Sequence, residues 1–307
     1  MAVDDLPDWL AVWCLKRLGA EPAEMLFGLE QISTVFGLRL TSGAEVMVKA
    51  REDDGRAVSC VAAQFQLAER GFPCARPLTS VTNVGSLAVH AEDFRPGGDI
   101  LHGQTPDVAV RYAQVFARLA AELAYVTVAP PLPNPRWVRW DHTDTGLWPA
   151  IDFLDRRDQS MVPAHVVDTA EQARDRLLTA DLPCVLGHSD FEAQNLRWHG
   201  REVWAVHDWD SLAWQPEAAL VGAASGVFPR GAGLPTLAPI GSSEAFLLAY
   251  QDVRGRAFTA VELEIAWAAS LWPAAHNARW EALHGQPPVC GNALQAQAAE
   301  RLRRANA

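Results

Sequence analysis

The 307-residue chain lacks several features that would assign it to particular classes of protein. No apolar run approaches the ~20 residues that a membrane-spanning helix needs, so we expect no membrane segment. The N-terminal stretch carries Asp4, Asp5 and Asp8 before any lysine or arginine, which is the opposite of a secretory signal and predicts no export. The five cysteines include no C-x-x-C pair, which disfavours a zinc cage or a disulfide framework and favours reduced thiols in a cytoplasm.

Positive charge is scarce, and lysine is almost absent. The formal net charge of −11 argues against nucleic acid and anionic membranes as partners. Of the 26 basic residues only two are lysines, Lys16 and Lys49. Because the sequence uses arginine wherever a generic positive charge suffices, each lysine invites a question about its specific role.

The first third of the chain alternates between helical and strand-like patterns. Apolar residues recur at helical spacing near the N-terminus, and β-branched residues dominate the next segment, which has a turn at residues 41–43. We expect, in order along the chain, a helix over 4–18, two antiparallel strands within 25–50, a helix over 56–70 and a strand over 86–94.

A Pro-Gly segment at residues 94–98 separates this part from a mainly helical remainder. Thr105, Pro106 and Asp107 have the side chains typical of an N-cap, a first helical position and a first turn, so they predict a helix start. We expect further helices over 164–179, 243–254 and 259–284, an irregular segment over 129–149, and two short strands around residues 199–200. The sequence therefore predicts an α+β fold, with a small antiparallel-sheet part at 1–95, a larger mainly helical part at 96–307, and a ligand between them.

The polar residues that carry chemistry gather in the middle of the helical part. Asp190 stands two positions after His188 and five before Asn195, and Asp208 follows an apolar strand after Asn195. A hairpin between them would return Asp208 close to Asn195. Phosphoryl transfer from ATP needs a carboxylate that accepts the proton of the acceptor hydroxyl, and oxygen ligands that hold Mg²⁺ on the phosphates. Asp190 suits the first role, and Asn195 and Asp208 suit the second.

The pattern H-x-D-x-x-x-x-N, followed by an apolar strand and Asp208-Trp209, resembles the aminoglycoside phosphotransferase family, whose members are relatives of the protein kinases. The resemblance implies a two-lobed protein-kinase-like fold, ATP and Mg²⁺ as cofactors, and transfer of the γ-phosphoryl group to a hydroxyl of a small molecule. The first expectation for this acceptor is an aminoglycoside or similar antibiotic, which would give antibiotic resistance. Choline, homoserine and sugars remain alternative acceptors.

The same resemblance assigns a nucleotide-binding role to residues of the first part. Lys49 lies between apolar neighbours in VMVKA, where the family has the lysine that contacts the α- and β-phosphates. An exposed edge-strand lysine is the alternative interpretation. The turn Gln31-Ile32-Ser33-Thr34 would cover the phosphates, with Ser33 and Thr34 as binding residues. The resemblance also implies that adenine contacts come from Glu92, Asp93 and Phe94, and that His188 braces the catalytic loop.

The chain departs from the family at three places. Residues 55–68 contain no acid, although the family places a glutamate on this helix to hold the lysine; Gln64 or Gln66 would then have to substitute. Position 189 is serine where glycine is common. The family's G-D-P-x-x-D-L-A pattern loses both acids at residues 214–221, which we expect to concern packing.

These departures keep other functions open. A nucleotide-binding pseudokinase is the main alternative, and retention of Asp190, Asn195 and Asp208 counts against it. A serine hydrolase using Ser189 and His188 is disfavoured because no G-x-S-x-G turn is present. Five residues on the late helices either line the acceptor site, as in the family, or belong to the core, which is commoner for aromatics: Trp267, Trp272, Trp280, Glu262 and Glu264.

Overall fold

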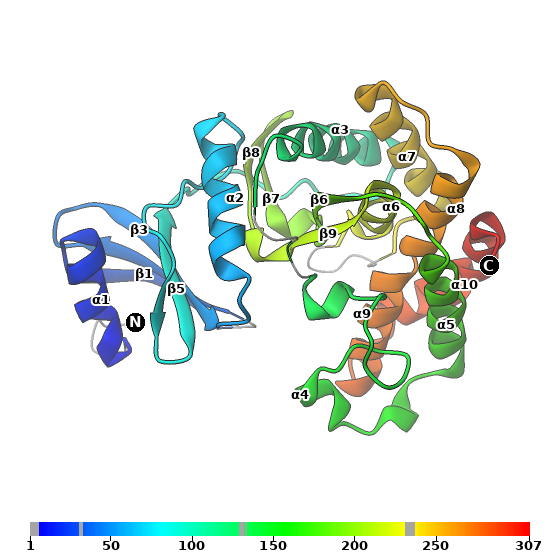
Figure 1. Ribbon diagram of the computed structural model, residues 1–307, viewed down its shortest axis with the longest axis horizontal. Coiled ribbons are helices and arrows are strands. Elements are labelled where there is room, and N and C mark those ends of the chain that lie inside the picture. The colour runs from blue at the N-terminus through cyan, green and yellow to red at the C-terminus, as the bar shows by residue number, and fades with distance from the viewer. Residues whose placement is uncertain (1–5, 31–32, 129–131, 133, 231–236) are drawn as a thin grey trace. The chain divides into compact units, whose positions relative to one another are not determined.

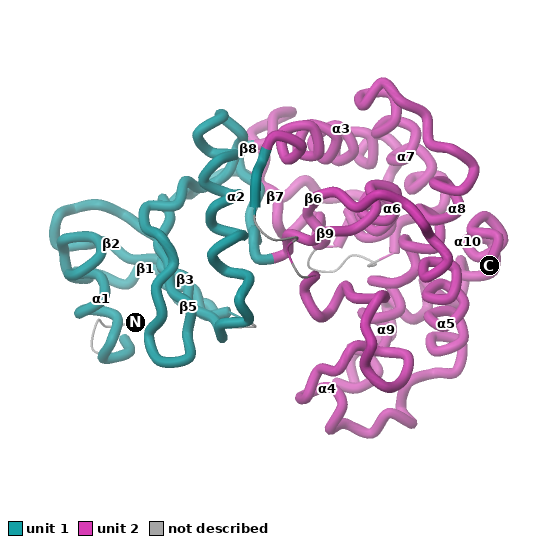
Figure 2. Tube along the Cα trace, in the orientation of Figure 1, with its two compact units in different colours: residues 1–98, 126–130, 204–210 teal, residues 99–125, 131–203, 211–307 magenta. Residues whose placement is uncertain are grey.

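The computed structural model describes residues 6–30, 33–128, 132, 134–230 and 237–307 (Figure 1). The chain forms two compact units (Figure 2). Unit 1 comprises residues 1–98, 126–130 and 204–210, and unit 2 comprises residues 99–125, 131–203 and 211–307. The division at 95/96 stays a prediction about functional lobes, since unit 1 also takes in two later segments.

Unit 1 is built on an antiparallel sheet of five strands in the order β1-β2-β3-β5-β4. The elements are α1 (Asp8–Leu18), β1 (Pro22–Glu30), β2 (Thr34–Leu40), β3 (Glu45–Glu52), α2 (Ala57–Glu69), β4 (Thr82–Val84) and β5 (Leu87–Asp93). The predicted helices, the strand near residue 90 and the turn at residues 41–43 are confirmed. The prediction of two strands within 25–50 is wrong, because β1 ends at Glu30 and a new strand begins at Thr34.

The two faces of this sheet differ in chemistry. On one face, Val46, Val48 and Ala50 of β3 form a core with Leu10 and Trp13 of α1. Because side chains alternate along a strand, residues 47, 49 and 51 of β3 point to the opposite face. Lys49 therefore lies on the face of the sheet that is opposite the packed core.

Unit 2 is mainly helical, and within the described residues it forms eight α-helices. They are α3 (Pro106–Leu123), α4 (Asp152–Asp155), α5 (Ala164–Leu178), α6 (Glu217–Val227), α7 (Ile240–Arg254), α8 (Ala260–Ala269), α9 (Trp272–Leu283) and α10 (Val289–Ala305). Strands β6 (Cys184–His188) and β9 (Leu212–Pro216) pair antiparallel, β7 (Leu196–His199) lies in the same unit, and the boundary between the two units falls within β8 (Glu202–Val206). Helices α3 and α7 run side by side, with Phe116 of α3 against Phe246 and Tyr250 of α7 (Figure 1).

Several helix predictions need correction. The single helix predicted over 259–284 is two helices, because Pro273 lies in the first turn of α9, where its missing N–H costs nothing. Helices α6 and α10 were not predicted. Thr105 occupies the N-cap of α3, but its side chain makes no capping hydrogen bond.

Two expectations from the sequence concern membrane segments and the state of the cysteines. Among the described residues no helix is both long and apolar enough to cross a bilayer. The five cysteines are free thiols, four of them buried, and burial raises the pKa of Cys14, Cys60 and Cys74 to about 12.

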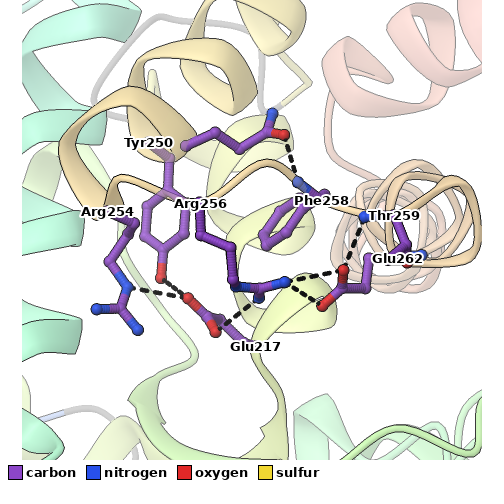
Figure 3. A network of polar contacts seen from close by, with 8 residues as sticks. Glu217, Tyr250, Arg254, Arg256, Phe258, Thr259 and Glu262 are labelled. Carbon is purple, nitrogen blue, oxygen red and sulfur yellow. Dashed lines mark hydrogen bonds and ion pairs between the residues drawn. The ribbon is translucent and has the colours of Figure 1, made fainter.

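The departure of residues 214–221 from the family pattern places Glu217 at the start of α6, where it ties three helices together (Figure 3). Its carboxylate accepts hydrogen bonds from the Tyr250 hydroxyl at 2.6 Å and from Arg254 Nε at 3.1 Å, and Arg256 Nη2 lies 3.1 Å away. Arg256 also pairs with Glu262, whose carboxylate forms a capping box with Thr259. The contacts of Glu217 agree with the expectation that this departure concerns packing, which stays a prediction.

The Glu217 network predicts a defined pH dependence of stability. Burial alone would raise the pKa of Glu217, but the hydrogen bonds from Tyr250 and Arg254 outweigh it and lower the pKa. The stabilisation is therefore present above the unfolded-state pKa of ~4.3 and is lost as pH falls through the folded-state value. We expect Glu217→Gln to lower the free energy of unfolding by about 1–2 kcal/mol at pH 7, with a smaller difference below pH ~4.

Urea unfolding across this pH range measures the difference. Glu69→Gln is the matched control, because Glu69 makes an exposed ion pair with Arg76 and its removal should matter little at either pH. A difference for Glu217→Gln that stays constant with pH would contradict this account.

Candidate active site

The predicted catalytic loop leaves β6 and lies in unit 2. Ser189 is anchored to the residue before β9, because its N–H and its hydroxyl both donate to the carbonyl of Ser211, at 2.8 and 2.6 Å. His188 is buried, and its Nδ1 accepts a hydrogen bond from the Asp190 backbone N–H at 3.3 Å. The Ser189 hydroxyl is thus engaged with the backbone rather than with His188, which further disfavours a serine hydrolase.

Asp190 and Asn195 contact each other directly. Asn195 ends a short 3₁₀ turn, η4 (Ala193–Asn195), and its Nδ2 donates to the Asp190 carbonyl at 2.8 Å and to Asp190 Oδ2 at 3.0 Å. Both donors of the amide are therefore used within the loop, which fixes the carboxylate of Asp190. Since an amide has one donor end and one acceptor end, the Oδ1 of Asn195 is the atom turned away from Asp190.

A buried acid in the same loop was not predicted. The side chain of Glu192 is only 1% exposed and forms an ion pair of 3.1 Å with Arg230, beyond the end of α6. Gln194 donates to its other oxygen at 2.7 Å. Burial, and then the neighbouring charge of Asp190, raise the pKa of Glu192 well above its usual value, against the effect of Arg230.

The same region of the chain also holds the loop through its backbone. The N–H of Ala193 donates to the carbonyl of Phe228 at 2.9 Å, and that of Gln194 donates to the carbonyl of Arg230 at 3.2 Å. The segment after α6 therefore braces the turn between Asp190 and Asn195 by both main-chain and side-chain contacts.

Lys49 lies in unit 1 and has a carboxylate partner. Its Nζ is 2.9 Å from Oε1 of Glu92 on β5, and the two side chains are 12% and 1% exposed. Burial acts to lower the pKa of Lys49, but the charges of Glu92 and Asp210 outweigh burial and raise it. The ammonium is thus protonated at neutral pH. The interpretation of Lys49 as an exposed edge-strand residue is disfavoured, because β3 is an interior strand of the sheet.

The two glutamines of α2 differ in their roles. Gln64 does not pair with Lys49 but donates to Oε2 of Glu92 at 2.7 Å. Gln66 donates instead to the carbonyl of Thr127 at 3.1 Å. The carboxylate beside Lys49 therefore comes from a strand, and α2 contributes through Gln64.

Asp208 belongs to a short segment that completes unit 1. The N–H of Val206 donates to the carbonyl of Pro73 at 2.8 Å, which attaches this segment to the first part of the chain. Asp210 pairs with Arg51 Nη1 at 3.2 Å, and its carbonyl accepts from Arg56 Nη1 at 3.0 Å. Asp208 adopts a left-handed backbone with φ of 60°, which non-glycine residues seldom adopt and which occurs in turns, at helix ends and at functional sites.

The remaining predicted nucleotide-binding residues occupy strand ends of unit 1. Thr34 begins β2 and Ser33 precedes it, whereas residues 31–32 of the predicted phosphate turn lie outside the described residues. Asp93 is exposed at the end of β5, and its N–H donates to the carbonyl of Arg76 at 2.9 Å. Phe94 packs against Phe27 of β1 with ring centroids 5.7 Å apart.

The predicted Mg²⁺ ligands offer suitable chemistry. Asn195 supplies an amide oxygen turned away from its hydrogen-bonded partner, and Asp208 supplies a carboxylate; Mg²⁺ prefers such oxygen donors and completes its shell with water and phosphate. Within the part of the chain that the structure describes, no group of three or more His, Cys, Asp or Glu residues could hold a metal by itself. Asn195 and Asp208 fall in different units, so their meeting stays a prediction.

The late-helix residues have mostly structural contacts. Glu262 caps α8, and Glu264 pairs with Arg176 at 2.6 Å. Trp267 is buried under the guanidinium of Arg304, 4.6 Å from its ring centroid. Trp272 packs against Trp148 at 5.5 Å, and Trp280 stacks on His284 at 4.1 Å, so the core interpretation fits Trp267 and Trp272 best.

Comparisons with known proteins identify the fold. The amicoumacin kinase hAmiN, solved with AMP-PNP, Ca²⁺ and Ami, matches with a TM-score of 0.65 at 11% identity, over 95% of this chain and 93% of that one. A thermostable mutant of aminoglycoside phosphotransferase APH(4)-Ia, solved with ADP and hygromycin B, matches at 0.57 and 13%, over 97% and 99%. Spectinomycin phosphotransferase APH(9)-Ia, with ADP and spectinomycin, matches at 0.55 and 12%, over 98% and 94%. No family model and no curated protein matches the sequence.

The chain thus has the two-lobed, protein-kinase-like α+β fold of the aminoglycoside phosphotransferases, as the sequence motifs predicted. These structural neighbours are small-molecule phosphotransferases. At such low identity the likeness establishes the fold alone, so the function of this chain must be argued from its own residues.

The brace on the catalytic loop can be tested by a double-mutant cycle. Arg230→Met leaves the carboxylate of Glu192 buried without its cation, so we expect a loss of about 1–3 kcal/mol in the free energy of unfolding. Adding Glu192→Gln removes the orphaned charge, and the double variant should be more stable than the sum of the single changes predicts, by at least about 1 kcal/mol.

The exposed pair Glu69–Arg76 provides the control cycle, where we expect a coupling near zero. Strictly additive changes at Glu192 and Arg230 would show that the ion pair does not brace the loop.

Proposed function

We propose that the chain is an ATP-dependent small-molecule kinase that transfers the γ-phosphoryl group to a hydroxyl of its acceptor. The observation that carries the proposal is the pair of hydrogen bonds from Asn195 to Asp190, which orients a carboxylate at the end of β6 and turns an amide oxygen away from it. In protein kinases one catalytic loop supplies both the carboxylate that takes the acceptor proton and the amide that binds a metal ion.

Each residue of the site has its own role in the proposed reaction. Asp190 Oδ accepts the proton of the attacking hydroxyl and holds that hydroxyl in line with the phosphate. Lys49 contributes an ammonium to the phosphates, and Ser33 and Thr34 contribute donors at the start of β2. Backbone groups of residues 92–94 contact adenine. His188 acts through the loop backbone, because its Nδ1 accepts from the N–H of Asp190.

Mg²⁺ would be held by Asn195 Oδ1 and the carboxylate of Asp208, and when bound it would neutralise charge on the phosphates. The positive φ of Asp208 supports this assignment, since such conformations persist only where the surrounding structure enforces them. Arg51 and Arg56 provide that enforcement by holding Asp210 two residues later.

For the acceptor, we propose an aminoglycoside or similar antibiotic. The support is the chemistry named for the structural neighbours, which include complexes with hygromycin B and spectinomycin, together with the acidity of this chain. Kinases for choline, homoserine or sugars are the alternatives within the same reaction class. The pseudokinase alternative loses its main support, because Lys49 has a carboxylate partner despite the absence of a glutamate early in α2.

The substitution Asp190→Asn tests the role proposed for Asp190. Asp190→Asn keeps the shape and the hydrogen bonding of the side chain but removes its ability to take a proton. Because the phosphates are held by other groups, we expect nucleotide affinity to change less than about threefold, while the rate of transfer falls by ~10²–10⁴-fold. Isothermal titration with ATP and Mg²⁺, and a coupled ADP-release assay with an acceptor found by screening, measure the two quantities.

Asp252→Asn serves as the control, since it makes the same change of a carboxylate to an amide at an exposed position of α7 that has no part in the proposed site. Transfer by Asp190→Asn at the parental rate would refute the assigned role of Asp190.

A further inference from the structure

Helix α2 lacks an acid where one would be needed to anchor the ammonium of Lys49. The only carboxylate of this helix is its last residue, Glu69, which pairs with Arg76 at 2.8 Å. The anion beside Lys49 is instead Glu92 of β5. The sequence alone did not reveal this partner, because Glu92 follows Lys49 by more than 40 positions.

The register of the sheet explains the contact. Strands β3 and β5 are antiparallel, with Lys49 opposite His90 and Met47 opposite Glu92. Lys49 and Glu92 are therefore diagonal neighbours on the same face, a separation that long side chains can bridge. Strand pairing therefore brings the two side chains within reach of each other.

Each oxygen of the Glu92 carboxylate has a separate partner. Oε1 lies 2.9 Å from Lys49 Nζ, and Oε2 accepts from Gln64 Nε2 at 2.7 Å. The same Gln64 nitrogen donates to the carbonyl of Ala75 at 2.8 Å, and the Gln64 side chain is buried. The Glu92 carboxylate is thus clamped between α2 and β3, with its orientation fixed at both ends.

We propose that Glu92, held by Gln64, is the positioning residue that aims the Lys49 ammonium at the nucleotide phosphates, a role that rests on the proposed function. A lysine ammonium is a compact charge on a flexible four-carbon stem and needs an anchor to present one geometry. It carries three donors, so contact with Glu92 leaves donors for phosphate oxygens. The Glu92 side chain is therefore committed to Lys49, and any contact of residue 92 with adenine falls to its backbone.

The experiment exchanges the carboxylate and the amide between strand and helix. Glu92→Gln removes the anion from Lys49 with little change of shape, and Gln64→Glu alone adds a second carboxylate beside Glu92. The double variant has the same number of charges as the parent, with the carboxylate now on α2 and the amide on β5. The amide introduced on β5 can accept from Lys49 through its oxygen and donate through its nitrogen to the carboxylate introduced on α2. Gln66→Glu is the matched control on the same helix, since Gln66 contacts Thr127 and not Glu92.

Two readouts separate positioning from mere stability. The chain has only two lysines, so the side-chain NMR signals of ¹³C-lysine-labelled protein report on Lys49, with exposed Lys16 as the internal reference. ATP affinity in the presence of Mg²⁺ is measured on the same samples. We expect Glu92→Gln to shift the Lys49 signal and to weaken ATP binding by ~10–100-fold, as for other losses of positioning. The Lys16 signal should not move.

The double variant should recover most of the ATP affinity and a single ordered Lys49 signal, and Gln66→Glu should resemble the parent in both. If Glu92→Gln leaves the Lys49 signal and ATP affinity unchanged, the positioning role is overturned. The role of Gln64 is overturned if the double variant binds ATP no more tightly than Glu92→Gln does. If Glu92→Gln does not fold, the double variant is compared with Gln64→Glu instead, and equal ATP affinity overturns the role. A parent whose Lys49 signal does not respond to ATP and Mg²⁺ would overturn the proposed function itself, although the NMR signals would still report whether Glu92 anchors Lys49.

Discussion

The ion pair between Lys49 and Glu92 is the constraint on which the proposed nucleotide-binding part of the molecule depends. A charge with this little exposure is costly without a partner, and removal of either partner would leave an uncompensated charge. The pair exists because β3 and β5 are in register, and the register is set by the apolar face of the sheet, where Val48 and Ala91 are buried in the core. The core on one face of the sheet therefore fixes the chemistry on the other.

Unit 2 also contains buried charged side chains, and each has hydrogen-bonding partners. Glu192 pairs with Arg230 and so ties the predicted catalytic loop to the segment after α6. Arg301 of α10 is fully buried and donates to neutral groups, the hydroxyls of Ser243 and Ser270 and the carbonyl of Ala238. Burial, with a smaller effect of Arg304, lowers the pKa of Arg301 to about 9, so it remains charged at neutral pH. Arg301 thereby connects α10 to Ser243 of α7 and to Ser270 at the end of α8.

Local patterns in the sequence were enough to predict the fold class, the first helices and the loop from His188 to Asn195. Long-range geometry was not predictable in the same way. The partner of Lys49 depends on strand register, and the partner of Glu192 lies 38 positions further along the chain. The sequence pattern does not predict helix α6, because this helix is buried and apolar on almost every side. Such a helix shows no alternation of apolar and polar residues at helical spacing. Within residues 25–50 the pattern predicted two strands where the structure has three, because no glycine or proline stands between the end of β1 at Glu30 and the start of β2 at Thr34 to indicate a turn.

The central claim is that this chain moves a phosphoryl group from ATP to a hydroxyl of a small molecule. The most direct measurement incubates the parent protein with ATP, Mg²⁺ and a panel of hydroxyl compounds that includes hygromycin B, spectinomycin, choline, homoserine and sugars, and follows each compound by mass spectrometry. The account predicts that at least one compound gains a single phosphoryl group, with an equal amount of ADP formed. Nucleotide binding without phosphate transfer to any acceptor or to water would contradict the account and favour a pseudokinase.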